Sequence, residues 1–320
     1  MFDLISFGEL LIDFTPIGTS EKGNPIFERN AGGGPANLAC CVAKLGGKAA
    51  FISKVGDDNF GKALREIVSE NGVNVDNVIL SKEYKTTLAF VHLDKSGDRS
   101  FSFYRKNGAD TMIDFEEINL KEIDGCKYLF SSSVLMTEGT SRQTSFDLLE
   151  YARSKKKVII FDPNLRLNLW GSESDAKECI KRALGYAGIV KLSEEELVFL
   201  LGEGDIKTNA KRLMDEYSIS ALLVTLGAKG CYAKVNGFEI MDIGFPDAKT
   251  IDTTAAGDSF TGGFIKKLIE NGKPVSEYSY EDAAGAIHFA NAVGALTTTK
   301  KGAISALPAL DEVNNFMKKL

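Results

Sequence analysis

The segment from Asp252 to Phe260 combines small residues with an acidic side chain at the start of a predicted amphipathic helix. Small residues before a helix let backbone N–H groups converge on one point, and the helix N-terminus adds roughly half a positive charge there. This arrangement suits a phosphate group. A carboxylate beside it, at Asp258, is suited to taking a proton from an attacking hydroxyl. An ordinary helix start, where capping and the helix dipole favour aspartate, explains the segment equally well.

A second segment, Gly32-Gly33-Gly34-Pro35-Ala36-Asn37, places three glycines before a helix that begins with proline. Glycines allow a ligand or a strand to approach the backbone closely. Asn37, in the first turn, would face back toward this loop. The segment is neither the GxGxxG dinucleotide fingerprint nor a GxxxxGK[ST] phosphate loop. A tight strand-to-helix turn is the alternative interpretation.

The elements that must position these two loops alternate between strand-like and helix-like patterns. Short apolar runs predict strands, and amphipathic stretches between them predict helices. Expected strands are 2–8, 49–55, 157–161, 188–192 and 221–225, and expected helices are 35–45, 59–71, 194–201 and 208–217. This rhythm predicts an α/β fold with a doubly wound, mostly parallel sheet and helices on both faces.

Two segments interrupt the rhythm. Residues 10–30 alternate without a helical period, and residues 86–105 read as two strands around a turn at 94–98. Strands without an intervening helix predict a small antiparallel sheet projecting from the α/β body. An edge hairpin is the alternative, and a lid is expected only if a site lies beneath it.

Composition excludes several classes of protein. The chain has 320 residues, with 38 basic and 44 acidic residues and a net charge of −6. This balance disfavours nucleic acid as a partner. No apolar run is long enough to span a membrane, and the N-terminus lacks a signal peptide's basic region. The five scattered cysteines predict buried free thiols in a reducing cytoplasm, and the two distant histidines disfavour a metal site or a catalytic triad.

Together the two loops resemble the two signatures of the ribokinase-like (PfkB) carbohydrate kinase family. The first is the glycine pair Gly32-Gly33 with Asn37, and the second is the DTxxAGD segment 252–258. Their order and their separation of about 220 residues make the pair far more specific than either loop alone. The resemblance continues through Gly8-Glu9, Phe103-Tyr104-Arg105, Asp162-Pro163-Asn164-Leu165-Arg166 and the VTLGxxG turn 224–230.

The resemblance implies a single α/β domain over 1–320, with lid strands at about 11–30 and 86–110. It also implies transfer of the ATP γ-phosphate to a primary sugar hydroxyl. Asp258 would be the base, and the N–H groups of Ala255, Ala256 and Gly257 would form an anion hole. Mg²⁺ would accompany ATP, because phosphoryl transfer depends mainly on positioning and electrostatics.

Further site residues follow from the same resemblance. The sugar would be held by Asp13, Gly33, Gly34, Asn37, Arg105 and Arg166. The nucleotide side would comprise Asn164, Lys191, Ser193, Glu196, Thr225, Gly227, Gly230 and Asn291. Asp252, Thr254 and Gly302 match a loop that often binds a monovalent cation such as K⁺. Three positions depart from the pattern: Ala255 replaces a glycine common in fructokinases, Ser193 replaces an asparagine, and no proline follows Arg105.

The expected function is that of an ATP-dependent sugar kinase, most similar to fructokinases that form fructose 6-phosphate. The alternatives are a 2-keto-3-deoxygluconate kinase, in which Arg105 and Arg166 would grip a carboxylate, a ribokinase, and a catalytically silent binding protein. ATP and a small sugar are the expected partners, with neither nucleic acid nor membrane. An exposed lid edge with Phe90, Val91 and Phe101 would allow a homodimer.

Overall fold

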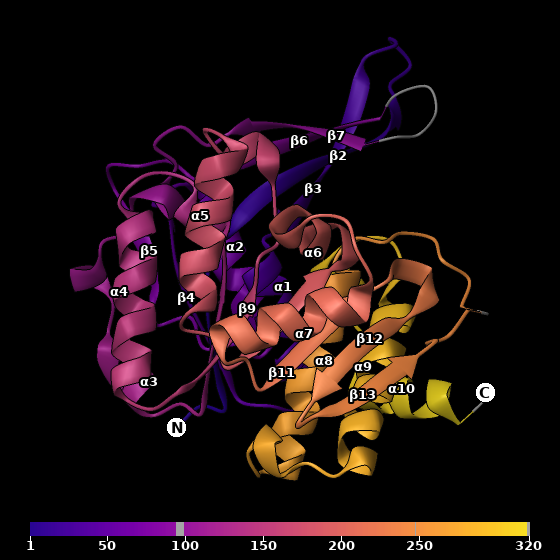
Figure 1. Ribbon diagram of the computed structural model, residues 1–320. Helices are drawn as coiled ribbons and strands as arrows, with labels where there is room; N and C mark the ends of the chain where they lie inside the picture. Colours follow the sequence, from indigo (N-terminus) through magenta and orange to yellow (C-terminus); the bar gives the residue numbers. More distant parts are fainter. Residues whose placement is uncertain (94–98, 247, 319–320) are drawn as a thin grey trace.

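A nine-stranded sheet forms the body of the molecule (Figure 1). The computed structural model describes residues 1–93, 99–246 and 248–318. The sheet order is β13-β12-β11-β10-β9-β8-β1-β4-β5, and all neighbours are parallel except β11–β12 and β12–β13. Its strands are β1 (Leu4–Phe7), β4 (Ala49–Gly56), β5 (Val78–Ser81), β8 (Tyr128–Ser132), β9 (Val158–Asp162), β10 (Ile189–Ser193), β11 (Ala221–Thr225), β12 (Cys231–Val235) and β13 (Phe238–Asp242). The predicted doubly wound, mostly parallel sheet is confirmed.

Helices cover both faces of this sheet, which explains why its central strands are almost wholly apolar. Alternate residues of β1 show the arrangement: Leu4 packs into one hydrophobic cluster and Ile5 into the other. The first face carries α1 (Gly34–Lys44), α2 (Asn59–Glu70), α8 (Ala256–Asn271), α9 (Tyr280–Thr297) and α10 (Leu310–Met317). The second carries α3 (Leu120–Asp124), α4 (Ser141–Ser154), α5 (Glu173–Leu184), α6 (Glu194–Leu201) and α7 (Ile206–Tyr217).

A second, four-stranded sheet projects from the body (Figure 1, top right). Its strands are β2 (Leu11–Thr19), β3 (Pro25–Gly32), β6 (Leu88–Leu93) and β7 (Arg99–Tyr104), in the order β3-β2-β6-β7. We call it the lid sheet. Its predicted turn at 94–98 lies outside the described residues.

Two expectations about the lid sheet are wrong. The sheet is mixed rather than antiparallel, because β2 and β6 pair in parallel. Phe90 and Val91 do not lie at an edge, because β6 is flanked by β2 and β7. Phe90 instead stacks on Phe14 at 4.8 Å between ring centroids. The edges are β3 and β7, and only Phe101 of the three named residues belongs to an edge strand.

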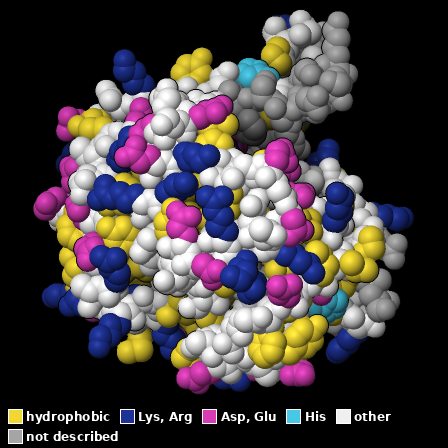
Figure 2. All heavy atoms as spheres, in the orientation of Figure 1, with side chains coloured by type: hydrophobic (Ala, Val, Ile, Leu, Met, Phe, Trp, Pro, Cys, Tyr) yellow, Lys and Arg dark blue, Asp and Glu magenta, His cyan; other side chains and the backbone are white. Residues whose placement is uncertain are grey.

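The surface shows no segregation of charge on the face drawn in Figure 2, where basic and acidic side chains are interspersed over the body. Among the described residues, no helix has the length and apolarity needed to cross a bilayer. All five cysteines are buried and unpaired, which confirms the prediction of free thiols.

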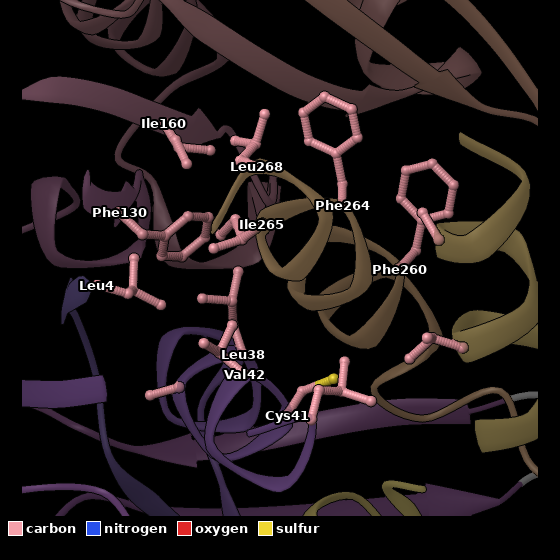
Figure 3. Close-up of a cluster of buried hydrophobic side chains, with 14 of the residues drawn as sticks. Leu4, Leu38, Cys41, Val42, Phe130, Ile160, Phe260, Phe264, Ile265 and Leu268 are labelled. Atoms are coloured by element: carbon pink, nitrogen blue, oxygen red, sulfur yellow. The ribbon is translucent and has the colours of Figure 1, made fainter. Parts of the chain in front are cut away.

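Close packing between α1 and α8 sets the two site loops against each other. Figure 3 shows Leu38 and Cys41 of α1 facing Phe260 and Ile265 of α8. Gly262 makes this approach possible, since a Cβ there would lie 2.8 Å from the Cys41 sulfur. The two helix N-termini, which carry both sequence signatures, are thereby brought together.

Candidate active site

The cleft between the lid sheet and the body has a volume of about 1370 Å³. It lies at the carboxyl ends of the parallel strands, where the chain switches from one side of β1 to the other, the usual ligand position in such sheets. Most of the predicted site residues line it: Asp13, Gly33, Gly34, Asn37, Arg105, Asn164, Arg166, Lys191, Ser193, Glu196, Asp252, Thr254, Ala255, Ala256, Gly257, Asp258 and Gly302.

The other four predicted residues lie outside this lining, toward the end of β11 and α9. Thr225 is the register partner of Ser193, so it adjoins the cleft. Gly227 and Gly230 follow it in a short turn with positive φ. The Asn291 side chain donates to Asp242 Oδ1 at 2.8 Å.

Asp258 occupies the first turn of α8 and is half-buried at the cleft wall. Asn37 Nδ2 donates to its Oδ2 at 2.9 Å, which fixes the carboxylate across the two signatures. Burial raises the pKa of Asp258, while Asn37, Lys191 and Arg166 oppose that rise. A carboxylate with a raised pKa and one oriented oxygen is a stronger proton acceptor than a freely solvated one.

Gly34 provides the close approach that the glycine run predicts. A Cβ at this position would lie 2.6 Å from Asn164 Nδ2 and 3.1 Å from Asp258 Oδ1. Its neighbour Gly33 has a φ of 122°, and a Cβ there would lie 2.3 Å from the Glu9 carbonyl oxygen. Neither position has room for a side chain, so the loop can lie directly against Asp258.

The backbone ahead of α8 forms a strained turn. Ala255 adopts a left-handed conformation, with φ 60° and ψ 8°. The N–H of Ala256 donates to the Thr253 carbonyl at 3.2 Å. The N–H of Gly257 belongs to the first turn of α8. N–H groups in the first turn of a helix have no acceptor within that helix. A phosphoryl oxygen in the cleft would find a backbone donor in the Gly257 N–H at this turn.

Replacing Ala255 with glycine is expected to raise the free energy of unfolding by about 0.5–1 kcal/mol, because an L-residue in this region is strained and glycine is not. Chemical denaturation measures the change. Ala284→Gly in the interior of α9 is the matched control and should lower stability by about 1 kcal/mol. A loss of stability in Ala255→Gly would contradict the strain assigned to this turn.

Lys191, at the cleft wall, links the sheet to the start of α8. Its Nζ lies 2.9 Å from Asp162 Oδ2, and its side chain is nearly enclosed. Burial alone would lower the pKa of Lys191, but Asp162 and Glu196 outweigh it and raise that pKa. A Cβ on Gly257 would lie 3.1 Å from the ammonium, so this charge sits beside the start of α8.

Glu196 orders the loops around this lysine. Its Oε1 accepts the Leu165 N–H at 2.6 Å, and its Oε2 accepts the Ser193 N–H at 2.7 Å. Ser193 caps α6 in return, which forms a capping box. Serine therefore supports this turn in place of the expected asparagine. Asn164, directly before Leu165, adopts a left-handed backbone conformation with a φ of 45°.

The end of the cleft beside the glycine loop carries two carboxyl groups, those of Glu9 and Asp13. Burial raises the pKa of Asp13 to about 6, against the opposing influence of Arg166. Burial also raises the pKa of Glu9 to about 7. Glu9 Oε1 accepts the Gly34 N–H at 2.9 Å, so it shapes the glycine loop. Sequence reasoning did not assign Glu9 to the site, although a charged residue directly after an apolar first strand was a visible signal.

The Asp252 carboxylate brings the predicted cation loop together. Its Oδ1 accepts the N–H and the hydroxyl of Thr254, at 3.0 and 2.7 Å. Its Oδ2 accepts the Gly302 N–H at 3.1 Å. Among the described residues, no group of three or more His, Cys, Asp or Glu side chains could hold a metal ion.

Fold and site together define a phosphotransferase of the carbohydrate kinase type. The pfkB family carbohydrate kinase model matches residues 1–310, and the chain belongs to this family. It is 40% identical over 320 residues to fructokinase-2 of Solanum lycopersicum, covering 98% of this chain and 96% of that relative. It is 38% identical to fructokinase-1 of Zea mays, covering 99% and 98%.

Comparison with solved structures agrees with this family assignment. Fructokinase from Xylella fastidiosa, crystallised with bound ATP, superposes with a TM-score of 0.89 at 31% identity, covering 99% of this chain and 98% of that one. Fructokinase from Vibrio cholerae O395, in a fructose-, ADP- and calcium-bound form, gives a TM-score of 0.87 at 31% identity and covers 99% of each chain.

Proposed function

We propose that this enzyme transfers the γ-phosphoryl group of ATP to the primary hydroxyl of D-fructose, which gives D-fructose 6-phosphate. The observation that carries the proposal is the Asp258 carboxylate, held by Asn37 at the start of α8 inside the cleft. Fructokinases at about 40% identity over nearly the whole chain support fructose as the substrate.

Each step of the reaction uses a feature of this chain. Asp13 and the glycine loop hold the sugar hydroxyls, and Asp258 takes the proton of the attacking oxygen. The turn at 255–257 and the Lys191 ammonium stabilise the charge of the transferring phosphoryl group. Asn164, Ser193, Glu196 and the more distant Thr225, Gly227, Gly230 and Asn291 bind the nucleotide. The lid sheet closes over the sugar and excludes water.

Mg²⁺ fits this cleft as the partner of ATP. It would be held by the phosphates with the help of the Asp162 and Glu196 carboxylates, which line the cleft and are of the oxygen-ligand type that this ion prefers. When bound, it neutralises phosphate charge. K⁺ would bind at the loop that Asp252 ties together with Thr254 and Gly302, where the Asp252 carboxylate and the Thr254 hydroxyl supply oxygen atoms.

The test is ADP release with Mg·ATP and K⁺ over a panel of fructose, 2-keto-3-deoxygluconate, ribose, glucose and no sugar. Turnover selective for fructose is expected. Selectivity for the keto acid would keep the mechanism and change the substrate, and silence from folded, ATP-binding protein would overturn the proposal.

Replacing a large organic cation, such as tetramethylammonium, with K⁺ at constant ionic strength is expected to raise activity severalfold. The cation would order the loop beside the phosphoryl site. In Asp252→Asn the response to K⁺ should shrink, because the loop loses its charge. Equal rates in both salts would remove Asp252, Thr254 and Gly302 from cation binding.

We also propose that this enzyme is cytoplasmic and consists of a single domain. Its lid sheet favours a homodimer. Ile26 on edge strand β3 and Tyr104 on edge strand β7 are exposed, and unpaired strand edges favour association. Light scattering that reports one chain at micromolar concentration would contradict the dimer.

A further inference from the structure

Arg105 is the residue that a carboxylate-binding kinase would use, yet its guanidinium is already occupied. It lies just beyond β7, lines the cleft and is 3% exposed. Its Nε donates to Asp110 Oδ2 at 2.8 Å, its Nη1 to Thr137 Oγ1 at 2.7 Å and its Nη2 to the Val134 carbonyl at 3.1 Å. The charge is therefore neutralised from behind, by a carboxylate that is 1% exposed.

Further acidic groups surround this arginine. Glu138 Oε1 lies 3.8 Å from Nη1 at the surface. Glu9 lies close enough for Arg105 to lower its pKa and for Asp110 to raise it. Asp13 lines the same end of the cleft, and Arg166 is the cation that acts on it. This end of the cleft thus holds two carboxyl groups, Glu9 and Asp13, whose pKa values its arginines influence.

We propose that Asp110 is a specificity-determining residue, which cancels the charge of Arg105 and so makes the sugar subsite select an uncharged sugar over a sugar acid. The inference rests on the proposed kinase function and narrows its substrate class. Specificity often depends on a repulsive element against the wrong ligand as much as on attraction to the right one. A sugar acid in this subsite would lie near the carboxyl groups of Glu9 and Asp13. Arg105 would already be paired with Asp110.

Asp110 also fixes where Arg105 points. Thr87, which directly precedes β6, donates its hydroxyl to Asp110 Oδ1. The N–H of Ala109 donates to the Lys85 carbonyl at 2.8 Å, which joins the segment after β7 to the segment before β6. The guanidinium is thus held in place by three hydrogen bonds, one from each nitrogen, and by the Asp110 carboxylate, so three of its five N–H donors are already used within the protein.

The experiment compares kcat/KM for 2-keto-3-deoxygluconate with kcat/KM for fructose in wild type and Asp110→Asn. The asparagine keeps an acceptor for Arg105 but removes the negative charge. The acid-to-fructose ratio is expected to rise about tenfold or more, mainly through a lower KM for the acid. A folded Asp110→Asn enzyme that loses both activities by the same factor would show a merely structural role and overturn the proposal.

A second variant keeps the test decisive if Asp110→Asn does not fold. Glu138→Gln removes the more exposed carboxylate beside Arg105 and should raise the ratio about twofold to threefold. Glu28→Gln, which removes a negative charge elsewhere in the cleft lining, is the matched control and should leave the ratio unchanged. An unchanged ratio in Glu138→Gln, or an equal rise in Glu28→Gln, would overturn the assignment.

Failure of the proposed function is read separately, from the wild-type enzyme. If wild type uses ribose or glucose instead of fructose, the proposal of fructose as substrate fails. The inference about Asp110 is then tested with the ratio of kcat/KM for the acid to kcat/KM for that neutral sugar. If wild type prefers the acid, both proposals fail. If no sugar is turned over, calorimetric affinities for fructose and the acid replace kcat/KM, and equal affinities in wild type would overturn the inference.

Discussion

Asp258→Asn is expected to lower kcat by about 10²–10⁴-fold while the KM values for ATP and sugar change little. Asparagine preserves the shape of the side chain and can still accept the hydrogen bond that Asn37 donates at 2.9 Å. It cannot take a proton from the sugar hydroxyl. Steady-state kinetics on both substrates measures the split between kcat and KM. Near-normal turnover would remove Asp258 from the mechanism.

The pH profile gives this variant an independent readout. Because burial raises the pKa of Asp258, wild-type kcat/KM should fall as the pH drops through that raised value, where the base becomes protonated. The variant should lack the part of this acid limb that is due to Asp258, while protonation of Asp13 still lowers kcat/KM at acid pH. A wild-type enzyme that is silent at every pH, although folded, would instead favour a binding protein.

Stability should move in the opposite direction to activity. A carboxyl whose pKa is higher in the folded state than in the unfolded state destabilises the fold increasingly as the pH rises through the folded value. Asp258→Asn removes that penalty, so its free energy of unfolding above this pH should exceed that of wild type. The comparison also separates loss of chemistry from loss of fold.

Lys191→Met is expected to lower the free energy of unfolding by about 3–5 kcal/mol, because it leaves the Asp162 carboxylate buried without its partner. Lys191 is only 8% exposed, and its Nζ lies 2.9 Å from Asp162. Denaturant titration measures the loss. Activity should fall as well, since the ammonium lies beside the first turn of α8.

The double variant Lys191→Met, Asp162→Asn is the control for this interpretation. Removing both charges should recover much of the lost stability, since no unpaired carboxylate remains. In the single variant, burial raises the pKa of Asp162 with no lysine to oppose it, so stability should decline further as the pH rises. A double variant as unstable as the single one would place the loss in packing rather than in charge.

Local signals predicted most of the body and the centre of the site. The apolar runs fixed β10 and β11 to within a residue, and the small residues before Asp258 marked the start of α8. Features that depend on distant pairing were missed. The β12–β13 hairpin was not predicted, and the position of β6 inside the lid sheet depends on its pairing with β2. Arg105 carried a recognisable motif, but its partners Thr137 and Val134 come from another element.

The hydrogen bond between Asn37 and Asp258 spans 221 residues of sequence, which has a consequence for how the enzyme is made. At about 5–20 residues per second of synthesis, Asn37 in α1 is made roughly 10–40 s before Asp258 in α8. During that interval the apolar side of α1 has no α8 to cover it, and Asn37 has no carboxylate to hold. Catalytic competence therefore arrives late in synthesis, so the appearance of activity reports that the long-range contact between α1 and α8 has formed.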